Sequence, residues 1–416
     1  MPAAAVDTAL YPQSLVAYGV AHNPSIKAAR ETWREKIENI RITTAYPDPQ
    51  VMATWFAEPL ETRLGPQEWN LSVTQPIPFP GKKSSMGRVA EAGAIMARIT
   101  LEQTVREVTA NIRASVHELV YIRSAQQIAG LNDDILQHMK KAAGVAYAAN
   151  RATLTDVVKA QAQEGQLAYD RILLQELEQT EIARLNGLLG KPVDASVDPI
   201  TLAPGRPLAF ALDQIHQLVM EHLEEVKMAR AALAAEEEKK TLARLTTLPD
   251  FKMGLFYASI GTPDTATLPQ DAGRDAIGIQ AGITVPLWFG ANISRVNAAD
   301  AGIRAAREKV EAARNKAAAD LRRLFFKVRN AERLMALYKE DLLPQAQSAL
   351  ETAETWFDQK QGTFSDFLEA QSTLYNFQLS LARARADYGK QLAALEGMAG
   401  RSLTETGPSA PAGEAR

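Results

Sequence analysis

The stretch TLTDVVKAQ at residues 153–161 returns as TFSDFLEAQ at residues 363–371. The same spacing of 210 residues places LNGLLG at 185–190 on LEGMAG at 395–400, and PIPF at 76–79 on PLWF at 286–289. Three ungapped matches at one spacing indicate an internal duplication. Nearer the start, Pro47-Asp48 matches Pro249-Asp250 at a shorter spacing. The second copy is therefore predicted to hold about eight extra residues between Asp250 and Pro286, as a longer loop.

Each copy predicts the same elements in the same order. A first helix, over residues 10–44 or 209–245, ends just before a proline. Two strands follow, over 51–58 and 69–74 in the first copy and over 251–259 and 276–285 in the second. A very long helix over 82–148 contains no proline, whereas Pro344 predicts a kink or break in its counterpart over 291–359.

Short turns at 149–152 and 360–362 lead into helices that run back along the long ones. Each returning helix opens with a capping box, Thr153-x-x-Asp156 or Thr363-x-x-Asp366, so each long helix is predicted to fold back as a hairpin. A seven-residue apolar register in the last helix predicts coiled-coil packing of Phe367, Leu374, Leu381, Tyr388 and Leu395. The first copy keeps this register only in part, because Glu181 interrupts Leu167, Leu174 and Leu188.

The strands alternate apolar residues with small or polar ones, which is typical of a sheet with one apolar face. Four strands cannot close into a membrane barrel alone, so closure is predicted to be intermolecular. The alternative is a small soluble sheet that caps a helical bundle. Aromatic residues near the strand ends form either an interfacial belt or packing against the helix junction; these are Trp69, Phe79, Trp288 and Phe289.

Composition and spacing exclude several functions. The net charge is −3, with acids and bases interleaved, so no nucleic-acid partner is expected. Cysteine is absent and the five histidines lack metal-ligand spacing, so neither a metal site nor a cofactor is predicted. No nucleophile–base pair, phosphate loop or carboxylate dyad supports an enzyme. The sequence contains no run of about 18 apolar residues, so no transmembrane helix is predicted. The first residues lack the features of a secretory signal, so the protein either stays inside the cell or is a mature form.

The repeated order of helix, strand pair and long helical hairpin, with QPIPFPGK at 75–82 and DVVKAQ at 156–161, resembles the TolC-like outer-membrane efflux ducts, the outer membrane factors. The resemblance covers nearly the whole chain. Its PFPGK form, at 78–82, is similar to the branch that serves heavy-metal efflux pumps of the resistance-nodulation-division class. Many relatives carry an N-terminal lipidated cysteine, which this sequence lacks.

This resemblance implies a mainly α fold with a small β membrane part. Three identical chains would contribute four strands each to one 12-stranded barrel in outer-membrane lipid, and their helices would form a tube in the periplasm. The implied partners are a periplasmic adaptor and an inner-membrane efflux pump. We assign repeat 1 to residues 1–190, a proline-containing linker to 191–208, repeat 2 to 209–400 and a disordered tail to 401–416.

The resemblance also places the two helical turns at a periplasmic tip that closes the duct. Asp156, Asp366 and Glu369 match its acidic positions, and in a trimer each would form a ring of three carboxylates that attracts cations. The alternative for the two aspartates is helix capping alone, and for Glu369 an ordinary solvated helix face. Lys159 stands where the second copy has Glu369, so the second copy is the first place to look for a gate.

The turn residues are candidates for adaptor docking: Asn150, Arg151, Lys360, Gln361 and Gly362. Ordinary turn chemistry is the alternative for them. The sequence therefore predicts a passive, trimeric outer-membrane channel of a three-part efflux system, with a soluble periplasmic coiled-coil scaffold or adaptor as the alternative. Metal ions, drugs and proteins remain open as substrates.

Overall fold

The computed structural model describes residues 12–149, 152–202, 206–265, 267, 269–359 and 361–404. The chain forms two compact units, and each contains segments from both repeats. One unit holds residues 30–100 and 228–313, which include all four strands. The other holds residues 1–29, 101–227 and 314–416, which include both helical turns.

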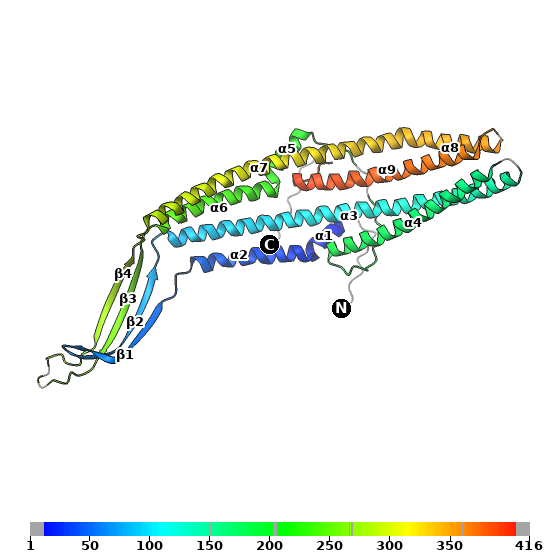
Figure 1. Ribbon diagram of the computed structural model, residues 1–416. Coiled ribbons are helices and arrows are strands. Elements are labelled where there is room, and N and C mark those ends of the chain that lie inside the picture. The colour runs from blue at the N-terminus through cyan, green and yellow to red at the C-terminus, as the bar shows by residue number, and fades with distance from the viewer. Residues whose placement is uncertain are drawn as a thin grey trace. The chain divides into compact units, whose positions relative to one another are not determined.

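The predicted order of elements is confirmed in both copies (Figure 1). The elements of the first copy are α1 (Pro12–His22), α2 (Pro24–Thr44), β1 (Gln50–Thr62), β2 (Gly65–Ile77), α3 (Lys82–Ala148) and α4 (Leu154–Leu189). Those of the second are α5 (Leu212–His222), α6 (Glu224–Thr246), β3 (Asp250–Ile260), β4 (Ala276–Thr284), α7 (Phe289–Ala336), the π-helical segment η1 (Leu337–Leu342), α8 (Leu343–Asp358) and α9 (Phe364–Ala399). At 1.5 Å per residue, α3 is about 100 Å long.

The first helix of each copy is wrongly predicted as continuous. In the first copy it divides at Asn23, whose side-chain oxygen accepts the N–H groups of Ser25 and Ile26 at 2.9 and 3.2 Å. This is an N-cap, and Pro24 suits the first position of the helix that follows because it has no N–H to satisfy. The second copy divides at the matching place, between α5 and α6. The expected single helices are therefore pairs, α1–α2 and α5–α6.

Pro344 perturbs the long helix of the second copy without breaking it. The helix passes through the six-residue π segment η1 and continues as α8, which begins at Leu343. A π segment shifts the hydrogen-bond pattern by one residue, so the missing N–H of Pro344 is accommodated within a continuous helix. The predicted irregularity is present, and it takes the form of a π-bulge.

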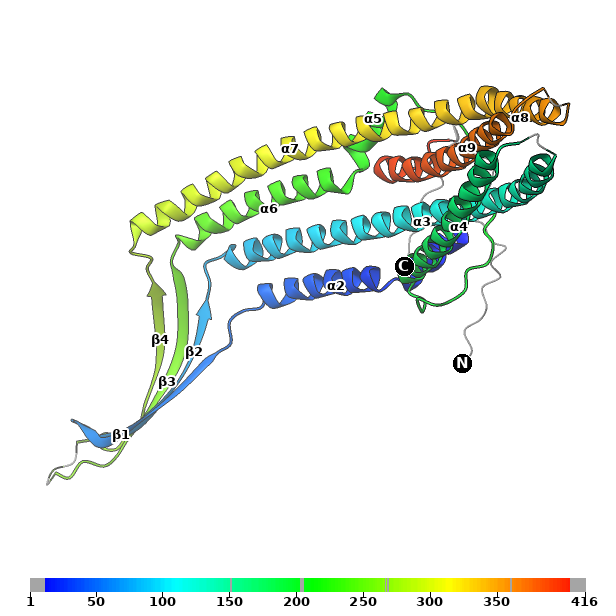
Figure 2. The same ribbon diagram turned by 45° about the vertical axis from the view of Figure 1, so that its right-hand side comes forward.

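The four strands form one antiparallel sheet in the order β1-β2-β3-β4, and they lie side by side in both views (Figures 1 and 2). The two central strands therefore come from different repeats. The β1–β2 turn takes only residues 63–64, whereas β3 and β4 are separated by residues 261–275, which confirms the longer second loop. Pro59 lies in the irregular part of the β1–β2 pairing, between Trp55 and Leu60.

The sheet has one apolar face. Strand register places on it Val51, Ala53, Trp55, Trp69, Leu71, Val73, Phe251, Met253, Leu255, Tyr257, Ile277, Ile279, Ala281 and Ile283. Several of these side chains are highly exposed, as Ile277 and Ile279 show at 79% and 77%. The opposite face is mostly small or polar, with Met52 and Phe256 as exceptions. Gly278 gives the Phe256 ring its room, because a Cβ at position 278 would lie 2.1 Å from a ring carbon.

The register corrects one equivalence between the repeats. Gln50 lies opposite Thr74, and Asp250 lies opposite Thr284. Since Thr74 and Thr284 are 210 residues apart, Gln50 is the structural counterpart of Asp250, and the Pro47-Asp48 match places this strand two residues out of register. The match of Ile26-Lys27 with Val226-Lys227 has the same 200-residue spacing, so the first helix carries the signal for this register and the Pro-Asp match does not.

In the unit that contains the helical turns, apolar side chains from both hairpins share one core. Near the turns this core includes Leu136 of α3, Leu167 of α4, Leu350 of α8, and Phe367 and Leu374 of α9. The predicted heptad is confirmed, since Phe367, Leu374, Leu381, Tyr388 and Leu395 are all buried. Glu181 is buried as well, and it accepts a hydrogen bond from Ser115.

Part of the predicted tail is ordered. Leu403 is fully buried, and its carbonyl accepts the N–H of Ala209 at 2.9 Å. This anchors residues 401–404, which we expected to be disordered, because a buried leucine gains more from packing than the short segment loses in conformational freedom. Residues 405–416 lie outside the described part of the chain. Among the described residues, no helix combines the length and apolarity needed to cross a bilayer.

Candidate functional site at the helical turns

Both capping boxes form at the starts of α4 and α9. Asp156 Oδ2 accepts the N–H and hydroxyl of Thr153 at 2.9 and 2.8 Å, and Asp156 returns its own N–H to that hydroxyl. Asp366 and Thr363 repeat this arrangement at 3.0 and 2.7 Å. The two aspartates therefore satisfy the orphan N–H groups of their helices, as the capping alternative states.

Capping does not remove the charge of Asp366. The Thr363 hydroxyl and N–H stabilise the carboxylate and hold the pKa of Asp366 below its usual value. The side chain is exposed. It can therefore cap the helix and still present a negative charge to solvent.

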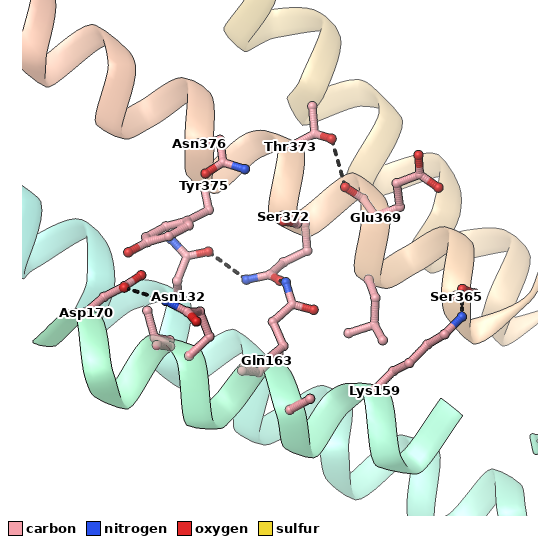
Figure 3. Close-up of a pocket in the computed structure, with 16 residues that line it drawn as sticks. Asn132, Lys159, Gln163, Asp170, Ser365, Glu369, Ser372, Thr373, Tyr375 and Asn376 are labelled. Atoms are coloured by element: carbon pink, nitrogen blue, oxygen red, sulfur yellow. Dashed lines mark hydrogen bonds between the residues drawn. The ribbon is translucent and has the colours of Figure 1, made fainter. Parts of the chain in front are cut away.

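Glu369 lies one turn further along α9, beside a groove between α4 and α9. The groove has a volume of about 710 Å³ and includes Asn132 of α3 in its lining. Figure 3 shows the Glu369 carboxylate pointing away from Gln163 and Asp170 of α4. The side chain is exposed, and no helix cap uses it. This leaves its charge available to solutes.

The counterpart of Glu369 in the first copy makes a different contact. Lys159 Nζ donates to Ser365 Oγ at 3.0 Å, and this bond spans the mouth of the groove from α4 to α9 (Figure 3). A further contact lies deeper, where Gln163 Nε2 approaches Gln371 Oε1 at 3.5 Å. The returning helices of the two copies are thus joined by polar side chains close to their N-terminal ends.

A buried amide pair beneath the groove is the feature that sequence reasoning missed. Gln371 Nε2 donates to Asn132 Oδ1 at 2.7 Å, and both side chains are almost fully buried. The heptad places Gln371 next to the apolar seam, where two helices alone would leave it at the rim. The third helix, α3, covers it. Only knowledge of which helices meet at the tip could have identified this pair.

Tyr375 lines the inner end of the groove. Burial and the nearby negative charge of Asp170 raise the pKa of Tyr375 to about 12. Asp170 also accepts a hydrogen bond of 2.9 Å from Gln166. Tyr375 therefore remains a neutral hydroxyl at physiological pH, and the groove gains no negative charge from it.

The candidate docking residues are only partly visible. Asn150, Arg151 and Lys360 lie outside the described residues. Gln361 and Gly362 both donate their backbone N–H to the carbonyl of Trp356, at 2.8 and 3.1 Å, and so close the end of α8. A Cβ at Gly362 would lie 3.0 Å from the Trp356 Cβ, so the turn favours glycine there. Trp356 itself is 53% exposed, and sequence reasoning did not single it out.

The aromatic residues near the strand ends divide into two groups. Trp69 packs against Tyr257 with ring centroids 5.2 Å apart, and Phe79 stacks on Phe251 at 6.3 Å. Trp288 and Phe289 are 81% and 71% exposed. Within the described residues, no group of three or more His, Asp or Glu side chains is placed to hold a metal ion.

Part of the chain matches a known family, and most of it matches known folds. Residues 216–401 match the family described as outer membrane efflux protein. The fold matches the outer-membrane channel OprN with a TM-score of 0.80 at 16% identity, over 95% of this chain and 91% of that one. It also matches the outer membrane protein VceC from Vibrio cholerae, with a TM-score of 0.73 at 18% identity, over 94% of this chain and 96% of that one.

A third solved structure, CusC, matches with a TM-score of 0.73 at 15% identity, over 94% of this chain and 92% of that one. No curated protein sequence matches. The family match covers nearly all of the second repeat, and the structural matches extend the same fold over most of the chain. These matches confirm the resemblance to TolC-like ducts and the mainly α fold with a small sheet.

Proposed function

We propose that three copies of this chain form a passive efflux duct in the outer membrane, whose helical turns form the closed periplasmic end. The family and the matched fold support the duct. The sheet supports the membrane part, because one face is exposed and apolar and so suits lipid, while the other is mostly small or polar. A periplasmic adaptor and an inner-membrane pump supply the energy and most of the substrate choice.

Glu369 and Asp366 are the acidic residues that we assign to the gate. Both are exposed on the first two turns of α9, and hydrogen bonds from Thr363 keep the pKa of Asp366 below its usual value. In a trimer they provide two rings of three carboxylates, which attract cations and repel anions at a constriction. Asp156 adds a weaker third ring, since Lys159 lies where the second copy has its second acid. The gate therefore favours cationic cargo, metal ions among them, although drugs and proteins remain candidates.

We assign adaptor docking to the two turns. Gln361 and Gly362 donate their backbone N–H groups to the carbonyl of Trp356, and the Trp356 side chain is exposed beside them. Tryptophan is enriched where proteins bind one another, because it buries a large area with few rotatable bonds. Asn150, Arg151 and Lys360 complete the proposed surface by their place in the sequence.

Single-channel recording tests the gate directly. Asp366→Asn combined with Glu369→Gln removes two charges per chain and keeps an oxygen acceptor at the cap. We expect a higher conductance and weaker block by divalent cations in planar bilayers. The matched control is Glu31→Gln with Glu35→Gln, which removes the same charge from exposed positions on α2. Unchanged conductance and block in the first variant would return both residues to capping and solvation.

A further inference from the structure

The middle of the sheet is a seam between the two repeats. Strands β2 and β3 pair there, with Ile77 opposite Phe251 and Val73 opposite Leu255. At the end next to α3, Asp250 Oδ1 accepts the N–H of Phe79 at 2.8 Å and the Nζ of Lys82 at 2.6 Å. A buried lysine is rare unless it is paired, and Lys82 is only 8% exposed. The Asp250–Lys82 ion pair and the Phe79–Phe251 stack stabilise this seam.

The second repeat contains the same strand-to-helix connection at the edge of the sheet, where no further strand of the chain pairs with it. Strand β4 and the start of α7 repeat β2 and the start of α3, as the PLWF and PIPF match shows. In this copy Leu287, Trp288 and Phe289 are 65%, 81% and 71% exposed. Their counterparts in the first copy, Ile77, Pro78 and Phe79, are only partly exposed. An edge strand with exposed apolar residues beside it is a surface for pairing with another strand.

The opposite edge of the sheet supplies the complementary strand. By sheet register β1 is the counterpart of β3, because Gln50 occupies the place of Asp250. A second copy can therefore bring its β1 to the β4 edge and rebuild the β2–β3 seam. Val51 at this edge is 68% exposed, because no strand of its own chain pairs with this side of β1.

The Asp250–Lys82 ion pair is replaced as a pair in the other repeat. Asp250 is replaced by Gln50, and the 210-residue spacing replaces Lys82 by Asn292. A carboxylate and an ammonium group are thus exchanged together for two amides. Within one chain, Asn292 Nδ2 donates to the carbonyl of Pro286 at 3.1 Å and Asn292 Oδ1 accepts from Arg295 at 3.0 Å. The second N–H of this amide can donate to the side-chain oxygen of Gln50, so the paired change preserves a hydrogen bond across the seam. Changing one partner alone would leave an uncompensated charge at the junction.

The geometry points to a defined seam between neighbouring copies, in which Gln50 of one copy faces Asn292 of the next, Val51 lies opposite Leu287, and Ala53 lies opposite Val285. This inference rests on the proposed trimer and specifies how its strands meet. The Pro47-Asp48 sequence match gives a competing register, shifted by two residues, in which Ala53 lies opposite Ile283. Both registers keep the apolar face continuous, so only a positional test separates them.

Disulfide crosslinking provides that test, because the chain contains no cysteine of its own. Ala53→Cys with Val285→Cys should give covalent dimers and trimers on oxidation, since directly opposite residues are about 4.5–5.5 Å apart. Ala53→Cys with Ile283→Cys should crosslink weakly, because the diagonal separation is about 7–8 Å. Each single cysteine serves as a control. Strong crosslinking of the Ile283→Cys pair with little at Val285→Cys would overturn the register.

Light scattering before oxidation separates this inference from the proposed function. A protein that is monomeric at that stage contradicts the trimer itself, whereas a trimer with the shifted crosslinking pattern contradicts only the seam.

A charge exchange tests the amide pair. Gln50→Asp or Asn292→Lys alone should lower the temperature at which the trimer dissociates, and the two together should restore it. Single and double variants with additive losses would show that Gln50 and Asn292 do not meet.

Discussion

The Nε2 of Gln371 on α9 donates a hydrogen bond of 2.7 Å to the Oδ1 of Asn132 on α3, inside the apolar core near the helical turns. Gln371→Leu would leave the Asn132 side chain buried without this partner. Losing one side of a buried hydrogen bond costs about 1–3 kcal/mol, so we expect a lower melting temperature in circular dichroism of the detergent-solubilised protein. Asn132→Leu with Gln371→Leu should cost less than the two single changes added. Strict additivity would mean that the pair does not act as a unit.

His117 on α3 makes the fold sensitive to acid. Burial, together with the positive charges of Lys390 and Arg113, lowers the pKa of His117 from 6.5 to about 4. The unfolded chain therefore binds this proton at a higher pH than the folded chain does. Stability is retained above pH 6.5 and falls as the pH drops towards 4, by about 3 kcal/mol per chain at about 1.4 kcal/mol per pKa unit.

The measurement is the free energy of unfolding in denaturant at a series of pH values. Acid also weakens the hydrogen bonds from Lys390 and Arg383 to Glu118, which outweigh the effect of burial and lower the pKa of that carboxyl. His117→Gln isolates the histidine, because it should flatten the curve between pH 6.5 and 4 and leave the Glu118 contribution. A variant with the full original slope would assign the acid sensitivity to other groups.

Gly389 on α9 leaves room for the His117 ring. A Cβ at position 389 would fall 2.2 Å from the nearest ring carbon, so Gly389→Ala forces the imidazole or the helix to move. Overpacking of this kind costs about 1–3 kcal/mol, more than the helix gains from alanine. Gly397→Ala on the same helix is the matched control, because its Cβ would meet Arg106 at an ordinary 3.6 Å. We expect a lower melting temperature for the first variant only, and equal melting temperatures would contradict the contact.

Asp366 of the proposed gate should keep its negative charge in acid. Hydrogen bonds from Thr363 hold the pKa of Asp366 below 3.8, so its negative charge persists as the solution becomes acidic. In a Glu369→Gln channel, residual block by divalent cations should therefore persist at acidic pH values where an ordinary aspartate loses its charge. Thr363→Val removes the hydroxyl donor and should move the loss of block to higher pH. If block vanishes at the same pH with and without the Thr363→Val change, Asp366 does not lie on the cation path.

Local signals made most of the fold predictable. Proline positions, capping boxes and an apolar heptad are features of neighbouring residues, so the bounds of α3 and the starts of α4 and α9 follow from the sequence. The π segment before Pro344 did not, because a proline signals irregularity without specifying how the helix absorbs it. The break at Asn23 was also missed, although an asparagine followed by proline is itself a helix-start signal.

The site was predictable only where one helix forms it. Capping by Asp156 and Asp366 depends on residues three apart and is confirmed. The Gln371–Asn132 pair and the Lys159–Ser365 bond join helices from different parts of the chain, so no local pattern contains them. The gate role of Glu369 remains a prediction, since it depends on how three copies meet.

The assembly state in the outer membrane distinguishes a trimeric duct from a soluble scaffold. The protein, produced with a secretion signal, is separated by membrane fractionation, extracted in detergent and weighed by light scattering. The duct account predicts outer-membrane protein with the mass of three 45.4 kDa chains. A soluble periplasmic monomer or dimer would contradict it and favour the coiled-coil scaffold.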